Sequence, residues 1–321
     1  MISALLATIA FAVTLLSPAQ AARWGKDYFP NVAVVDQDGT RFNFYDDLIH
    51  NRIVVVSFIY TTCRDICPLV TGRLAQVQEK LGDLAGREIF FLSITVDPKN
   101  DTPERLKAHA EAFGAGPGWK FITGKPDDIR LIRHKLGDRS RTLGTHRNEI
   151  VIGNDSTGEW MHDSAFGDLN VLAMTITNMD PLRRQLAAQR VRGDTGTTVP
   201  ESAIAPGQVL FVKACAACHT IGRGQRVGPD LKDVAVRRTR DWLTDYITAP
   251  AAMRASGDAT ALELSKQFSR IRMPTLGLSD DDATDVLKYI ELEGARKNTA
   301  GGHQGKRERV QPALSTVGHQ H

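Results

Sequence analysis

Apolar residues in the first half of the chain fall in short continuous runs that alternate with helix-like stripes. Residues 54–59 and 89–96 are apolar runs with several β-branched side chains, which is typical of buried strands. Between them, apolar side chains from Leu69 to Leu81 recur at the spacing of one helix face. Because strands alternate with helices, the pattern predicts an α/β sheet flanked by helices.

The remaining elements of this half follow from turn residues and shorter patterns. Residues 32–44 are typical of a hairpin with an Asp-Gly turn. A helix is expected to start at Pro103 and to be capped by Asp101 or Thr102, because proline fits the first helical position. Further elements are expected as a strand at 119–123, a helix at 127–136, a strand at 149–154 and a mostly helical segment at 170–189, restarted by Pro181.

The chain changes character after residue 190. Residues 191–204 are polar and rich in turn formers, which is typical of a linker. An apolar stripe over residues 283–290 predicts a terminal helix, and residues 296–321 lack apolar periodicity, as a flexible tail does. The expected organisation is an N-terminal segment at 1–21, a first domain at 26–190, a linker at 191–204, a second domain at 205–295 and a tail at 296–321.

Composition and the N-terminus narrow the class of protein. A net charge of +3 over 321 residues is too small to indicate nucleic-acid binding. Residues 2–16 are apolar, and an Ala-x-Ala site follows that ends at Ala21, which is typical of a secretory signal peptide. The run is short for a membrane-spanning helix. We therefore expect export, to a bacterial periplasm, with retention of the segment as a membrane anchor as the alternative.

The four cysteines form two close pairs, and the first pair lies where a strand leads into a helix. In an oxidising compartment such cysteines are expected to be oxidised, metal-bound or covalently used. Cys63 and Cys67 are four residues apart, so a helical turn places them on the same face. Two such thiols can form a disulfide or bind a soft metal, for which copper(I) is the natural candidate. The alternative is a pair of small buried core residues.

The segment around this pair resembles the Sco/SenC family of copper-binding, thioredoxin-like proteins that serve cytochrome c oxidase. The matching motifs are Phe-Ile-Tyr-Thr-Thr-Cys-Arg-Asp-Ile-Cys-Pro at 58–68 and Val-Asp-Pro-Lys-Asn-Asp-Thr-Pro at 96–103. The resemblance covers roughly Tyr28 to Gln189. It implies a thioredoxin-like fold, copper as the metal, and the oxidase subunit that carries the copper centre as the partner.

The same family adds a histidine just before a late strand as the third copper ligand. By position, His146 is the match, so the resemblance implies copper binding by Cys63, Cys67 and His146. This chain has Thr145 where the family usually has Asp before this histidine, and it has Arg64 where the family often has Pro after the first Cys. The alternatives are His162, which follows the late strand, and a site without a third histidine.

The second cysteine pair belongs to the pattern Cys215-Ala-Ala-Cys218-His219, which is that of c-type haem attachment. The two thiols form thioethers to the porphyrin, and the imidazole of His219 reaches the iron from the same side. The following Val-Gly-Pro-Asp-Leu segment at 227–231 resembles the loop of class I cytochromes c whose proline carbonyl orients the haem histidine.

The sixth iron ligand is expected to be a methionine. Arg-Met-Pro at 272–274 resembles the segment of class I cytochromes c that supplies it, so Met273 is the expected ligand. Met253 is the alternative, although no matching motif surrounds it. The resemblance covers about Ala205 to Gly294 and implies a small all-α cytochrome c domain with haem c, closed to substrates and suited to electron transfer.

Three functions are compatible with these residues. The leading hypothesis is a periplasmic copper chaperone for the oxidase, with a fused haem domain that exchanges electrons with a redox partner protein. The second is an enzyme, a thiol–disulfide oxidoreductase with Cys63 as the attacking and Cys67 as the resolving thiol; this reaction does not need His146. The third makes the first domain a docking module for an electron-carrier cytochrome.

Overall fold

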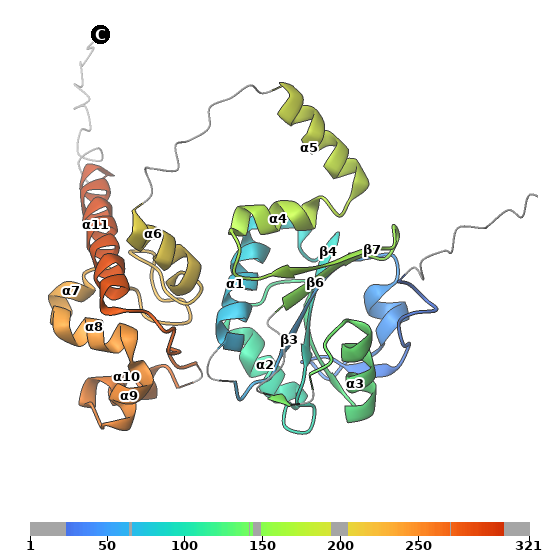
Figure 1. The fold of residues 1–321 in the computed structure, drawn as a ribbon, viewed down its shortest axis with the longest axis horizontal. Coiled ribbons are helices and arrows are strands. Elements are labelled where there is room, and N and C mark those ends of the chain that lie inside the picture. The colour runs from blue at the N-terminus through green and yellow to red at the C-terminus, as the bar shows by residue number, and fades with distance from the viewer. Residues whose placement is uncertain are drawn as a thin grey trace, which may run out of the picture.

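A mixed sheet forms the centre of the first domain (Figure 1). The structure, a computed structural model, describes residues 24–63, 66–140, 142–143, 149–193, 205–269 and 271–304. The strands of the sheet lie in the order β2-β1-β5-β4-β3-β6-β7. They are β1 (Ala33–Val35), β2 (Arg41–Asn43), β3 (Ile53–Ile59), β4 (Ile89–Thr95), β5 (Trp119–Gly124), β6 (Glu149–Asn154) and β7 (Glu159–Ser164).

The central strands β3, β4 and β5 are parallel, and β6 and β7 continue the sheet in antiparallel pairing. The helical elements of the domain are η1 (Phe44–Ile49), α1 (Ile66–Leu81), η2 (Gly82–Leu84), α2 (Pro103–Ala112), α3 (Pro126–Lys135), α4 (Leu169–Thr177) and α5 (Pro181–Gly193). The predicted α/β class and the order of its strands and helices are confirmed.

Alternating residues of β3 pack into two different cores, one on each face of the sheet. Val55 and Ile59 belong to the core under α1, α2 and α4, whereas Val54 and Val56 belong to the core under α3 and η1. This two-sided burial explains the continuous apolar run, because both faces of a central strand must be covered.

Three elements of this domain, η1, η2 and β7, are absent from the sequence-based expectations. Strand β7 is an edge strand whose side chains are mostly half-exposed or exposed, so it needs no apolar run to pair with β6. The short π-helix η1 begins at Phe44, the last residue of the expected hairpin, and ends at Ile49. The helix from Pro103 is capped by the hydroxyl of Thr102, which accepts a hydrogen bond from the backbone N–H of Arg105.

The second domain is helical (Figure 1). Phe211, Ile221, Val286 and Ile290 form its small core, which includes the apolar stripe expected at 283–290. The last helix is longer than expected, since it runs through Arg296, where the tail was expected to begin, to Gln304. The elements are α6 (Pro206–Leu210), η5 (Phe211–Cys215), α7 (Val234–Arg237), α8 (Arg240–Thr248), α9 (Pro250–Ala255), α10 (Ala259–Gln267) and α11 (Asp280–Gln304).

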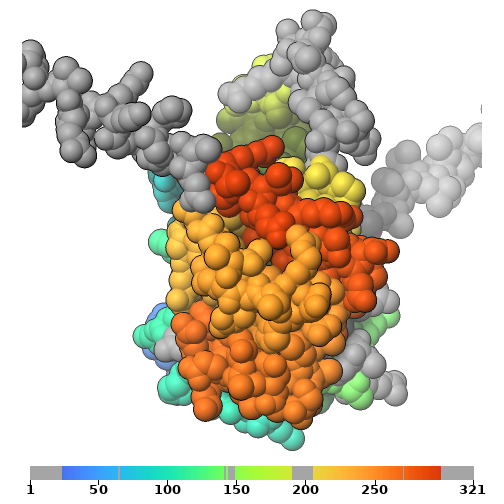
Figure 2. Space-filling view, turned by 90° about the vertical axis from the view of Figure 1, so that its left-hand side faces the viewer, coloured from blue at the N-terminus to red at the C-terminus, as the bar shows by residue number. Residues whose placement is uncertain are grey.

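The helical domain lies against the side of the first domain that carries α1 (Figures 1 and 2).

The expected signal segment at 1–21 and most of the expected linker fall outside the described residues. Among the helices that are described, none combines the length and the apolar character needed to cross a membrane.

Candidate copper and haem sites

Cys63 and Cys67 meet at the junction between β3 and α1. Cys63 follows the end of β3, and Cys67 lies in the first turn of α1; both side chains are buried. A hydrogen bond between the two thiols and the burial of the site raise the pKa of Cys67 well above its usual range. A metal that binds here has to displace thiol protons, because thiolates are the ligands.

A buried aspartate fixes the chain just before this pair. The backbone N–H of Thr61 lies 3.2 Å from both carboxylate oxygens of Asp101, and the Thr61 hydroxyl donates to Oδ1 at 2.5 Å. The hydroxyl of Thr95 donates to Oδ2 of the same carboxylate at 2.5 Å. Asp101 is fully buried. The motif at 96–103 therefore positions the cysteine motif at 58–68. Sequence reasoning missed this role, because neither the family motif nor the cap position of Asp101 indicates a contact with Thr61.

The two candidate histidines differ in their relation to the cysteine pair. His146 lies outside the described residues, but the first residue of β6, Glu149, follows it by three positions. Because β6 runs antiparallel to β3, with Val151 opposite Val56, the start of β6 lies toward the end of β3 that leads to Cys63. The first residue of β6, Glu149, thus lies at the end of the sheet that leads to the cysteines.

His162 lies elsewhere. It lies on β7, where it pairs with Val151 of β6, and Val151 in turn pairs with Val56 of β3. His162 is therefore level with the middle of β3 and not with the end of β3 that leads to Cys63. Its ring lies beside Gly137, just after α3, and its Nδ1 is 3.6 Å from a carboxylate oxygen of Glu149. Cross-strand partners share a face of the sheet, so His162 lies on the α3 side, opposite the side covered by α1.

Within the described part of the chain, no group of three His, Cys, Asp or Glu side chains is arranged to hold a metal.

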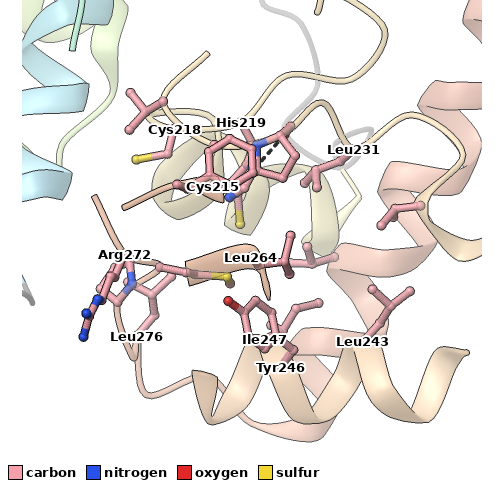
Figure 3. A pocket seen from close by; sticks show the side chains of 18 of the residues that line it. Cys215, Cys218, His219, Leu231, Leu243, Tyr246, Ile247, Leu264, Arg272 and Leu276 are labelled. Atoms are coloured by element: carbon pink, nitrogen blue, oxygen red, sulfur yellow. Dashed lines mark hydrogen bonds between the residues drawn. The ribbon is translucent and has the colours of Figure 1, made fainter. Parts of the chain in front are cut away.

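The residues of the haem-attachment pattern line a cavity in the second domain (Figure 3). η5 ends at Cys215, and the following turn brings Cys218 and His219 to the same side. The Nδ1 of His219 is 2.9 Å from the carbonyl oxygen of Pro229. A carbonyl can only accept, so Nδ1 carries the proton and Nε2 is left to bind iron.

A glycine makes room for this imidazole. A Cβ at Gly228 would lie 2.5 Å from Cε1 of His219, so no larger residue fits without moving the ring. The backbone N–H of Gly228 also donates to the carbonyl of Cys218 at 2.8 Å, which ties the loop to the attachment segment. Burial lowers the pKa of His219, which keeps its ring neutral as metal binding requires, and burial raises the pKa of Cys215 and of Cys218 to about 12.

The cavity fits a large apolar ring system. Its volume is about 400 Å³, in the range of small-molecule and cofactor pockets, and mostly apolar side chains line it. Met273 lines it together with His219, whereas Met253 is not among the lining residues described. Other lining residues include Leu231, Leu243, Tyr246, Ile247, Leu264 and Leu276 (Figure 3).

Two residues of the first domain, Pro68 and Leu69, also line this cavity. Sequence reasoning missed them, because they directly follow the first cysteine pair and were assigned to the first domain alone. Their presence means that the helix carrying Cys67 contributes to the wall of the haem cavity.

Comparison with known proteins finds one matching family model for each of the two domains. Residues 20–148 match the model of the SCO1/SenC family, and residues 204–292 match the model of the cytochrome c family. The chain therefore joins a SCO1/SenC domain, which has an α/β fold, to a helical cytochrome c domain, as both resemblances indicated.

Individual curated relatives match about a third of the chain. The SCO2-like protein of Rickettsia prowazekii is 33% identical over 103 residues, which are 32% of this chain and 48% of the relative. The SCO1 protein homolog of Bacillus subtilis is 31% identical over 90 residues, 28% of this chain and 45% of the relative. The chain thus spans about half the length of the curated relatives it matches. The structure of Bradyrhizobium japonicum ScoI with copper bound is similar with 20% identity and a TM-score of 0.39, covering 46% of this chain and 96% of that one.

Proposed function

We propose that the SCO1/SenC domain binds copper through Cys63, Cys67 and His146 and passes it to the copper centre of cytochrome c oxidase. The observation that carries the proposal is the contact between the two buried thiols at the end of β3. Thiolate and imidazole are ligands that suit copper(I). Membership of the first domain in the SCO1/SenC family supports the same metal and partner.

The strand arrangement supports His146 over His162 as the third ligand. Three residues of extended chain span at most about 10 Å, so His146 is within reach of the edge where β6 begins. His162 lies on the opposite face of the sheet from α1, which carries Cys67. The expected signal peptide at 1–21 supports a periplasmic location for the copper site.

The cytochrome c domain is proposed to hold haem c through thioethers of Cys215 and Cys218, with His219 and Met273 as iron ligands. When bound, the haem supplies a one-electron redox group. The residues of the chain orient the imidazole through Pro229, exclude water with the apolar wall, and offer a thioether for the sixth position. A domain built in this way favours electron transfer to or from a redox partner protein over substrate chemistry.

Copper stoichiometry of the reduced full-length protein tests the first proposal. We expect one tightly bound copper per chain, lost in Cys63→Ser and weakened in His146→Ala, with His162→Ala unchanged. His162 is the matched control, because it is a histidine of the same domain at the other candidate position. Loss of binding in His162→Ala with binding intact in His146→Ala would reassign the third ligand.

The thiol–disulfide oxidoreductase is the second candidate, since the same thiol contact also precedes a disulfide. Exchange does not need a third ligand, so His146→Ala separates the two functions. No tight copper in the wild type, together with rapid exchange with a thiol partner that survives in His146→Ala, would favour the oxidoreductase over the chaperone.

A further inference from the structure

One face of α1 contacts the cytochrome c domain along most of the helix (Figure 1). Its residues recur at intervals of three and four along the sequence, which places them on one side of the helix. We call this side the docking face, and it consists of Pro68, Leu69, Gly72, Arg73, Gln76 and Glu79. It begins directly after Cys67.

Arg73 joins the two domains through backbone carbonyls. Its guanidinium donates to the carbonyls of Val212, at 3.2 Å, and Lys213, at 2.7 Å, in η5 of the cytochrome c domain. It also donates to the carbonyls of Ala165 and Gly167 in its own domain. The side chain is buried at 1% exposure. A buried charge is stable only when its donors are satisfied, and here the carbonyls of both domains satisfy them.

The haem-attachment segment itself rests on the docking face. A Cβ at Gly72 would lie 2.9 Å from the carbonyl oxygen of Ala217, which stands between the two haem-attaching cysteines. Nε2 of Gln76 donates to the carbonyl of Ala216 at 2.8 Å. Glu79 forms an ion pair with Arg226, which follows the attachment pattern. Only glycine at position 72 allows this close approach of the two backbones.

The first turn of α1 completes the haem cavity. Pro68 and Leu69 line the same cavity as Cys218 and His219, and Leu69 is only 5% exposed. Its neighbours Val70 and Leu74 pack into the core of the SCO1/SenC domain instead. The side chain of Leu69 therefore forms part of the wall of the haem cavity, although Leu69 belongs to α1, the helix that carries Cys67.

We propose that the docking face is a dedicated interaction surface whose partner is the chain's own haem-attachment segment, and that α1 is a permanent wall of the haem cavity. The two cofactor sites are then held next to each other through Cys67 and Pro68, which are consecutive residues. The inference rests on the proposed function, namely that the cavity is the haem pocket. The docking of the two domains does not depend on copper binding; only the statement about two adjacent cofactor sites does.

Gly72→Gln and Gln76→Glu test the docking. Glutamine is a better helix former than glycine, so the first change adds bulk against Ala217 without weakening α1 itself. The second replaces a donor to the Ala216 carbonyl by a carboxylate, which repels it. Lys80→Gln, at an exposed position of the same helix, is the matched control. All variants are made in the full-length, haem-loaded chain.

Two readouts are expected to change together: the docking of the domains, followed by NMR relaxation and amide exchange, and the haem reduction potential. In both docking variants, NMR relaxation should show the two domains tumbling separately, with backbone amides of residues 212–217 exchanging at least tenfold faster. The haem reduction potential should fall, because water that reaches the uncovered cavity favours the more charged ferric state. Lys80→Gln should leave both readouts at wild-type values.

Wild-type tumbling and potential in both Gly72→Gln and Gln76→Glu would overturn the proposal. Neither readout requires copper, so failure of the copper proposal leaves the test intact. Haem content is measured separately in each variant, and a wild-type chain that takes up no haem would refute the haem assignment, while the tumbling measurement still decides whether the domains dock.

Discussion

The carboxylate of Asp101 accepts hydrogen bonds from both the backbone N–H and the hydroxyl of Thr61, two residues before Cys63. The two residues are far apart in sequence and belong to different loops at the end of the sheet. Because the carboxylate is buried, its hydrogen bonds are not shared with water, and they hold the approach to the cysteine pair in one conformation.

Asp101→Asn should weaken both the fold and the copper site. The amide nitrogen of asparagine has no lone pair to accept from Thr61 or Thr95, so a charge-assisted bond is lost at a cost of about 2 kcal/mol. Denaturant unfolding and copper competition titrations measure the two effects. Asp97→Asn is the control in the same turn, because the Asp97 side chain is bonded at the surface to Asn100. Equal losses in both variants would contradict a special role for Asp101.

The buried His109 should make the first domain sensitive to acid. Burial lowers its pKa from 6.5 to about 4, so the unfolded state binds a proton that the folded state does not between these values. Stability is therefore full above pH 6.5 and falls as the pH drops toward 4, by about 3 kcal/mol from this group.

His109→Gln should flatten this part of the stability–pH curve, measured by urea unfolding from pH 7 to pH 4. His134→Gln, at an exposed position of α3, should leave the curve unchanged. An unaltered slope in His109→Gln would show that other groups cause the acid sensitivity.

Gly228→Ala should disturb the haem histidine. The added methyl group meets the ring of His219 and pushes it from the position fixed by Pro229. We expect at least a tenfold rise in the fraction of chains without correctly ligated haem, seen in the visible absorption spectrum and in haem content. Gly167→Ala adds the same methyl group where the nearest atom is 3.8 Å away, and it should behave as wild type.

Met273→Ala should open the sixth coordination position of the iron. Met273 lines the cavity with His219, so its loss leaves a site that added imidazole can occupy. Spectroscopic titration with imidazole should show binding at least tenfold tighter than in the wild type. Met253→Ala removes the other candidate and should titrate as wild type does; the reverse result would assign the ligand to Met253.

Local patterns in the sequence determined the α/β order and the position of both cysteine pairs. Apolar runs such as 54–59 report burial directly, because a central strand is covered on both faces. The spacing of Cys215, Cys218 and His219 is set by covalent attachment to one porphyrin, so the sequence alone predicts the haem-attachment residues. His146, outside the described residues, stays a prediction of the resemblance.

The tertiary structure alone decided the contacts between distant segments. Nothing in the local pattern links Asp101 to Thr61, or Leu69 to the haem cavity, because such contacts depend on which elements come to lie side by side. β7 likewise escaped prediction, since an edge strand is held by backbone hydrogen bonds that leave no apolar signature. Periodicity fixes which side of a helix is apolar, but the approach of two backbones at Gly72 and Ala217 exists only once both domains have folded and met.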